Sequence, residues 1–324
     1  MLVPVSEKET FSSDFLPDTR HPSPSFKMIA SLHPCITKDI NILCAGRLLS
    51  EGEKTRLKKA RAVIVPQGVT AGVYKECRRL VPRVFPNYDL RFPLEGKVGD
   101  TLLFEYYQVP HPRTLVFESR EALFENYPDL DLLPSQLSGY PLVLKANQGG
   151  EGAFVFLVHS KKELIEKLEL LPKGTLLPEG FVLQERIDHG GKDLRVVVLY
   201  DVFYAYWRVQ QNPEVFLTNQ SQGGQIDFGG DILLKERAVG AVRDFCERSG
   251  INLAGFDIIF DQKANPAVPL FLEINYYFGR KGLGGSMRFY EMLEQAVDRW
   301  LTSLNKGGDL KTNTIGWTLM NRIV

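Results

Sequence analysis

The stretch "AGFDIIFDQKANPAVPLFLEIN", residues 254–275, holds two short apolar segments separated by a run of turn-forming residues. The pattern predicts two β-strands joined in a hairpin. Because side chains alternate between the faces of a strand, Glu273 and Asn275 point to one side, and Leu272 and Ile274 point to the other. Burying a carboxylate such as Glu273 without a partner costs several kcal/mol, about 2–7 even for a neutral polar group, so something should compensate it.

The neighbouring strand offers a partner for this carboxylate. If the hairpin is symmetric about Asn265, Asp257 lies directly opposite Glu273. Like charges that face each other across a sheet repel, and a bound divalent cation removes that repulsion. Hard oxygen ligands of this kind suit magnesium, so Asp257, Glu273 and Asn275 are candidate metal ligands. The alternative is that the three groups face solvent independently.

A second group of polar residues lies in "VLKANQGGEGAFV", residues 143–155. Lys145 interrupts an apolar strand, and the turn after it contains Gly149, Gly150 and Gly152, whose backbone N–H groups could approach phosphate closely. The alternative is an ordinary hairpin turn. The segment lacks the Gly-Lys-Ser/Thr of a P-loop and the glycine spacing of a dinucleotide fingerprint.

A third group consists of Asp193, Arg195 and Arg208 in the segment "DLRVVVLYDVFYAYWRV", residues 193–209, which predicts a long β-hairpin. Asp193 and Arg195 share a strand face, and Arg208 returns on the second strand. One interpretation is a structural salt bridge. The other is a set of cations that neutralises a triphosphate beside magnesium.

The bulk composition restricts the class of protein. Lys and Arg together equal Asp and Glu together at 39 each in 324 residues, so no basic excess indicates a nucleic-acid partner. The four cysteines show no CxxC spacing, which disfavours a zinc site and favours reduced thiols. No secretory signal and no run long enough to span a membrane is visible, so a cytoplasmic protein is expected.

The order of the segments predicts an α/β (α+β) protein with more than one unit. "DINILCAG" at 39–46 is the expected first strand, and a helix over 96–109 would place Leu102, Leu103, Tyr106 and Val109 on one side. The predicted organisation is an extended arm over 1–27, a small N-terminal α/β domain over 28–115, a larger domain over 116–305 with subdomains of about 116–190 and 191–305, and a tail over 306–324.

Taken in order, these segments resemble the ATP-grasp enzymes, most closely the RimK-type glutamate ligases and more distantly glutathione synthetase. The matching stretches are "PLVLKANQGGEGAFVFLV", "FVLQERIDHGGKDLRVVVLYDVFYAYWRV", "LTNQSQGG", "GFDIIF" and "LFLEIN". The resemblance covers about residues 115–305 and implies an ATP-grasp fold preceded by a small N-terminal α/β domain.

The resemblance also implies roles for individual residues. Lys97 and Lys145 would contact the nucleotide phosphates, and Gly149, Gly150 and Gly152 would belong to the mobile loop that covers them. Gln184, Glu185, Arg186 and Ile187 would hold the adenine, with Asp193 in the nucleotide site. Arg195 and Arg208 match arginine positions near the phosphates and the acyl phosphate, and Asn219 matches the asparagine before the family's Gly-Gly pair and joins them in the implied catalytic set. Asp257, Glu273 and Asn275 match the magnesium ligands.

Two departures from the family pattern concern the substrate. Phe278 stands at the proline position of the usual Asn-x-x-Pro-Gly, and Gln222 replaces a basic residue before the Gly-Gly pair. Arg280 and Lys281 follow in the same divergent segment and are candidates for holding an acidic substrate, because arginine suits bidentate carboxylate binding. The alternative is a solvated loop. His159 and His189 are interpreted as ordinary polar residues.

The implied activity is an ATP- and magnesium-dependent carboxylate–amine or carboxylate–thiol ligase that acts through an acyl phosphate, with amino acids or peptides as substrates. The expected cofactors are ATP and two magnesium ions, with manganese as an alternative. No nucleic acid or membrane partner is expected, and a homodimer is compatible with the sequence. The alternatives are a nucleotide-binding protein without ligase activity and an ATP-dependent phosphotransferase.

Overall fold

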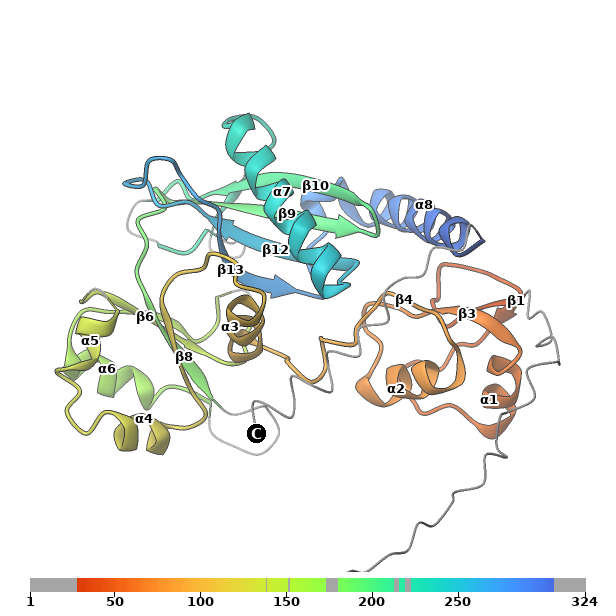
Figure 1. Ribbon diagram of the computed structural model, residues 1–324, viewed down its shortest axis with the longest axis horizontal. Coiled ribbons are helices and arrows are strands. Elements are labelled where there is room, and N and C mark those ends of the chain that lie inside the picture. The colour runs from red at the N-terminus through yellow and green to blue at the C-terminus, as the bar shows by residue number, and fades with distance from the viewer. Residues whose placement is uncertain are drawn as a thin grey trace, which may run out of the picture.

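The structure is a computed structural model that describes residues 28–137, 139–150, 152–172, 180–212, 216–218 and 223–305. The predicted arm, the predicted tail and Asn219 lie outside these residues. Within them the chain forms three β-sheets with helices packed around them (Figure 1). In this part of the chain no helix is both long and apolar enough to cross a bilayer.

The N-terminal sheet is parallel, with strand order β2-β1-β3-β4. Its first strand is not the predicted one: the strand at 39–46 shrinks to two residues, and the chain enters the sheet earlier, at Met28. That entry was missed because a four-residue strand directly after a Ser- and Pro-rich stretch gives too short a pattern to recognise. The elements are β1 (Met28–Ser31), β2 (Ile40–Asn41), α1 (Glu51–Leu57), β3 (Ala60–Ile64), α2 (Ala71–Leu80) and β4 (Val84–Phe85).

The second sheet, here called the glycine-turn sheet, is antiparallel with strand order β5-β8-β6-β7. The predicted hairpin around the glycine turn is confirmed, with Lys145 paired to Val155. Ser160 caps the following helix by accepting the Glu163 N–H at 3.2 Å. The elements are β5 (Thr114–Phe117), α4 (Arg120–Asn126), α5 (Leu133–Gln136), β6 (Leu142–Ala146), β7 (Val155–Val158), α6 (Lys161–Leu168) and β8 (Phe181–Glu185).

The third sheet, here called the acidic sheet, is antiparallel with strand order β11-β10-β9-β12-β13. The predicted register is confirmed: Asp257 pairs with Glu273, and a bulge follows between Asp257 and Ile258. Gly250 ends the helix before β12 in a left-handed conformation, which glycine adopts without strain. The elements are β9 (Lys192–Leu199), β10 (Val202–Val209), β11 (Gln225–Asp227), α7 (Ile232–Ser249), β12 (Leu253–Ile259), β13 (Leu270–Asn275), the 3₁₀ turn η2 (Lys281–Leu283) and α8 (Gly285–Asn305).

The three sheets do not pack equally. Residues of the N-terminal sheet share continuous cores with the acidic sheet; Phe85, for example, packs in one cluster with Val197 and with Trp300 of α8. The glycine-turn sheet has a core of its own, formed with α4, α5 and α6. The predicted domain boundary near 115 falls at β5, where this separate core begins, and the division of the chain at that point remains a proposal.

Helix α3 (Lys97–Tyr106) lies between the glycine-turn sheet and strand β13 of the acidic sheet (Figure 1) and contacts β5, β8 and β13. The predicted apolar side of this helix is wrong at Tyr106, which is 43% exposed. Its buried residues instead include Lys97, Asp100 and Thr101. A helix enclosed by two sheets is buried on more than one side, so a single apolar stripe does not describe it.

Candidate active site

A cavity of about 490 Å³ is lined by residues of both the glycine-turn sheet and the acidic sheet. It brings together nearly all of the residues that the sequence singles out. Arg280 and Lys281 are not among its lining residues, although Gly279 and Gly282 on either side of them are. The predicted residues that line it are Lys97, Lys145, Gly149, Gly150, Gly152, Gln184, Glu185, Arg186, Ile187, Asp193, Arg195, Arg208, Asp257, Glu273 and Asn275.

Lys145 is the buried cation of the glycine-turn side. It lies on β6, is buried, and donates from Nζ to the Gln184 Oε1 at 2.7 Å. Gln184 in turn donates to the Thr114 hydroxyl at 2.9 Å, which fixes the direction of its amide. Burial lowers the pKa of Lys145 to about 8, since the low-dielectric surroundings disfavour its charge. A cation held by a neutral amide is suited to receive an anionic ligand.

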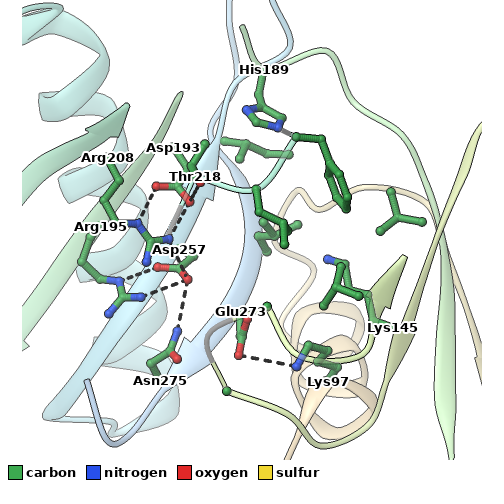
Figure 2. A pocket seen from close by; sticks show the side chains of 18 of the residues that line it. Lys97, Lys145, His189, Asp193, Arg195, Arg208, Thr218, Asp257, Glu273 and Asn275 are labelled. Atoms are coloured by element: carbon green, nitrogen blue, oxygen red, sulfur yellow. Dashed lines mark hydrogen bonds and ion pairs between the residues drawn. The ribbon is translucent and has the colours of Figure 1, made fainter. Parts of the chain in front are cut away.

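The glycine turn after β6 requires glycine at Gly149. Its φ is 145°, and an added Cβ would lie 2.6 Å from the carbonyl oxygen of Ala153. The carbonyl of Gly149 accepts a hydrogen bond from Lys97 Nζ at 3.1 Å. The same ammonium group lies 3.8 Å from Glu273 Oε1, so Lys97 connects the turn with the acidic sheet (Figure 2).

On the acidic sheet, two arginines and two aspartates form a buried network (Figure 2). Arg195 donates to both carboxylate oxygens of Asp257, and Arg208 donates from Nε to Asp193 at 2.7 Å and lies 3.0 Å from Asp257. Burial would raise the pKa of Asp257, but Arg195 and Arg208 outweigh burial and keep it below its ordinary value. Asp193, Arg195 and Arg208 therefore form salt bridges, as the first interpretation of this group expects, with Asp257 as a further member.

The strand register explains why these side chains meet. Tyr206, Arg195, Asp257 and Glu273 are directly paired across β10, β9, β12 and β13, so they form one row across the sheet. Gly282 lies so close to the Tyr206 ring that an added Cβ would be 2.1 Å from its Cζ. The row therefore ends against the backbone of the divergent 276–285 segment.

Asp257, Glu273 and Asn275 all line the cavity, and their oxygen donors are of the kind that a divalent cation takes. Asn275 donates its amide to Asp257 at 3.2 Å, and the Glu273 side chain is 30% exposed at the cavity wall. Among the described residues no cluster of three or more His, Cys, Asp or Glu side chains forms a metal site. Two carboxylates with an amide suit magnesium, which usually takes one or two carboxylates and completes its shell with water and phosphate oxygens.

Some lining residues were not predicted from the sequence. The Thr218 hydroxyl donates to Asp193 at 2.6 Å, and His189 and Tyr206 also line the cavity. Tyr206 could have been found, because it lies two residues before Arg208 and therefore on the same face of β10. Thr218 and His189 lie in loops, where no periodicity places a side chain.

Arg280 lies beside the cavity against the last helix. Its guanidinium stacks 4.6 Å from the ring centroids of Phe289 and Tyr290 and donates to the Tyr290 hydroxyl at 2.9 Å. A long hydrogen bond of 3.5 Å reaches Gln67, which lies between β3 and α2. The partners recorded for Arg280 in the described part of the chain are thus uncharged, whereas Lys281 is exposed.

Residues 111–288, more than half of the chain, match the family of RimK-like ATP-grasp domains. The chain belongs to the RimK-like ATP-grasp family. The resemblance found in the sequence is confirmed, and so is the ATP-grasp fold class. Curated relatives of this ATP-grasp chain include a probable alpha-L-glutamate ligase 1 of Shewanella amazonensis, 32% identical over 50% of this chain and 52% of that protein. Another, from Hahella chejuensis, is 31% identical over 48% of each chain.

The chain thus spans about half the length of the curated relatives it matches. Solved structures support the ATP-grasp fold over a longer range. The D-alanine–D-alanine ligase of Bacillus anthracis is similar with a TM-score of 0.57 and 16% identity, over 83% of this chain and 88% of that one. A RimK domain ATP-grasp protein of Sphaerobacter thermophilus gives a TM-score of 0.50 and 16% identity, over 83% and 98%.

Proposed function

We propose that the protein is an ATP- and magnesium-dependent ligase that joins a carboxylate to an amine, with a thiol as the alternative acceptor. The observation that carries this proposal is one cavity with two chemically different walls. The glycine-turn wall presents a buried ammonium group and a glycine turn, which suit phosphate. The acidic wall presents carboxylate and amide oxygens beside two guanidinium groups, which suit magnesium and the charge that develops during phosphoryl transfer.

In this proposal, residues of both walls bind the nucleotide, each wall holding a different part of it. Lys97, Lys145 and the turn of Gly149, Gly150 and Gly152 would hold the phosphates, and Asp193 would orient Arg208 toward them. The end of β8 and the loop after it, from Gln184 to Ile187, would hold the adenine. Asp257, Glu273 and Asn275 would hold one or two magnesium ions, or manganese, which when bound neutralise charge on the phosphate oxygens. Asn219 belongs to the proposed catalytic set by its place in the family pattern.

The proposed reaction has two steps. A carboxylate oxygen of the first substrate attacks the terminal phosphorus of ATP, and the bond from that phosphorus to ADP breaks. The amine of the second substrate then attacks the carbonyl carbon of the acyl phosphate, phosphate leaves, and the amine loses a proton. Arg195 and Arg208 would stabilise the charge on the transferring group. The glycine turn would exclude water, which otherwise hydrolyses the acyl phosphate.

Arg280 is the proposed anchor for an acidic first substrate, with Lys281 nearby. Its recorded partners are neutral groups, and the backbone on both sides of it lines the cavity. An amino acid such as glutamate is the first substrate to test, since the relatives are named probable glutamate ligases. All four cysteines are free thiols, which agrees with a reducing cytoplasm where ATP and magnesium are available.

The proposal is tested by magnesium-dependent ADP release with a panel of acids and amines that includes glutamate and peptides. Mass spectrometry of the product should show an amide and free phosphate. A product that keeps the phosphate would identify a phosphotransferase, and ATP binding without ADP release would identify a binding protein. Glu273→Gln should lower magnesium-dependent turnover at least about a hundredfold, and full retention would remove Glu273 from the ligand set.

The substrate anchor has a test of its own. Arg280→Ala should raise the KM of the acidic substrate by about tenfold or more and leave the KM of ATP nearly unchanged, because a lost charged hydrogen bond is worth about 1.5–3 kcal/mol. Lys281→Ala is the matched control in the same loop and should have a smaller effect. Equal changes in both KM values for Arg280→Ala would show that Arg280 supports the fold of the loop instead.

A further inference from the structure

Helix α3 carries polar side chains on its buried first turn. Lys97, Asp100 and Thr101 are each no more than 7% exposed. Buried polar groups are costly unless they are hydrogen-bonded, so the partners of these residues indicate what the turn does. In the described part of the chain, the Thr101 hydroxyl donates within the helix, to the Lys97 carbonyl at 2.8 Å. The hydrogen-bond partners of this first turn outside the helix lie directly after β6 and on β13, on the two sides of the cavity.

One end of the connection is Asn147, directly after β6 and two residues before Gly149. Its carbonyl accepts the Lys97 N–H and its side-chain oxygen accepts the Val98 N–H, both at 3.0 Å. Gly96, at the N-cap, has no side chain that could cap the helix, and an added Cβ would lie 2.4 Å from the Asn147 Oδ1. The start of the glycine turn therefore caps α3 from outside the helix.

The other end of the connection is Asp100, one turn further along α3. Its Oδ2 accepts the backbone N–H of Ile274 at 3.1 Å. Ile274 lies between Glu273 and Asn275 on β13, which is the edge strand of the acidic sheet. The edge of a sheet carries unpaired N–H groups, and Asp100 satisfies the one that sits between the two candidate metal ligands. Lys97 spans the same gap from the Gly149 carbonyl to Glu273.

We propose that α3 couples the glycine turn to the candidate metal-binding end of β13, with Asn147 and Asp100 as positioning residues at its two ends. Four residues of one helical turn, 97–100, join the two walls. A shift of the glycine turn toward a phosphate therefore moves the backbone that carries Glu273. Because the glycine-turn sheet has a separate core with α4, α5 and α6, the sheet and these helices would shift together as one unit. The consequence for ligands rests on the proposed function: a nucleoside triphosphate and a divalent cation would bind cooperatively through α3.

Hydrogen exchange of the ligand-free protein tests the coupling directly. Asp100→Ala should accelerate exchange at the far end, at the amides of Asn147 and Ala153, which donate to Gly180 and Gly150. Asn147→Ala should accelerate exchange in peptides that contain Ile274. An increase of about fivefold or more at the end remote from each substitution is expected for coupling of ordinary strength. Changes confined to the substituted end would overturn the proposal.

Matched variants separate positioning from general loosening. Thr101→Val removes a buried hydrogen bond that stays within the helix and involves no hydrogen bond to either sheet in the described residues, so it should leave both remote peptides unchanged. Asp100→Asn and Asn147→Asp each keep an acceptor oxygen, so they should restore slow exchange at the remote end. If Asp100→Ala or Asn147→Ala fails to fold, Asp100→Asn or Asn147→Asp is combined with Thr101→Val in its place. Hydrogen exchange at the remote end of that double variant then shows whether the retained acceptor oxygen preserves protection. Remote acceleration in Thr101→Val alone would contradict the proposal.

Calorimetry then distinguishes this proposal from the proposed function. ATP with magnesium, and ATP with a chelator, are titrated into the wild type and into Asp100→Ala. The factor by which magnesium raises the affinity for ATP should be at least about fivefold smaller in Asp100→Ala than in the wild type. If the wild type binds no ATP while the alanine variants still show the remote exchange changes, the proposed function is wrong and the coupling holds. If the wild type binds ATP with magnesium while the exchange changes in the variants stay at the substituted end, the coupling proposal is wrong and the proposed function is unaffected.

Discussion

The two walls of the cavity handle charge in opposite ways. On the glycine-turn sheet, Lys145 is buried beside a neutral amide, and within the described residues no carboxylate is hydrogen-bonded to it. On the acidic sheet, Asp257 already has two guanidinium partners, and Asp193 has Arg208 and Thr218. Under the proposed function, one wall would gain its counter-charge from a ligand, whereas the other would exchange internal partners on ligand binding. The same kind of substitution should affect stability in opposite directions on the two walls.

The largest effect is expected on the acidic wall. Asp257→Asn leaves Arg195 buried without its carboxylate, and breaking a buried ion pair by removing one partner costs about 3–5 kcal/mol. The free energy of unfolding, measured in urea, should fall by about that amount, and magnesium-dependent ADP release should be lost. The double variant Asp257→Asn with Arg195→Gln should recover much of the stability and none of the turnover. Recovery of turnover would show that Asp257 acts only as a structural partner.

Lys145→Met is expected to give the contrasting result on the other wall. Removing a buried ammonium group removes its desolvation cost, so the free energy of unfolding should not fall. ATP affinity should drop by about 10- to 100-fold, as one charge-assisted hydrogen bond to phosphate is lost. Calorimetric titration and urea unfolding of one preparation measure both. A clear loss of stability would show that Lys145 is held by more than Gln184 and would remove the contrast.

The pH dependence should follow the same lysine. Its pKa in the folded protein, about 8, lies below the ordinary value near 10.4 of the unfolded chain. Between these values the unfolded state binds more protons, so this group makes the protein more stable as pH rises, with no further gain above about 10.4. ATP binding needs the protonated form and should weaken above about pH 8, approaching tenfold per pH unit. Lys145→Arg stays charged and should flatten that profile.

The sequence predicted the acidic wall better than α3, and the reason is physical. A two-residue alternation fixes which strand side chains share a face, so the pairing of Asp257 with Glu273 follows from the hairpin alone. Helix periodicity predicts only one apolar stripe, and it therefore missed Asp100, which is buried because two sheets enclose the helix. Thr218 approaches Asp193 from a loop, where contacts depend on tertiary packing that no local pattern encodes.

The smallest effect is expected where the glycine-turn sheet is exposed to solvent. Arg113 pairs with Glu185 at 2.9 Å, but its side chain is 57% exposed, so water screens the pair. Arg113→Ala should change the free energy of unfolding by less than about 1 kcal/mol, since exposed ion pairs contribute about 0–1 kcal/mol. ATP affinity, measured by the same titration as for Lys145→Met, should change by less than about threefold, although Glu185 lines the cavity. A larger loss of affinity would mean that the ion pair orients the adenine end of the site, and the contrast between the two walls would then extend to β5.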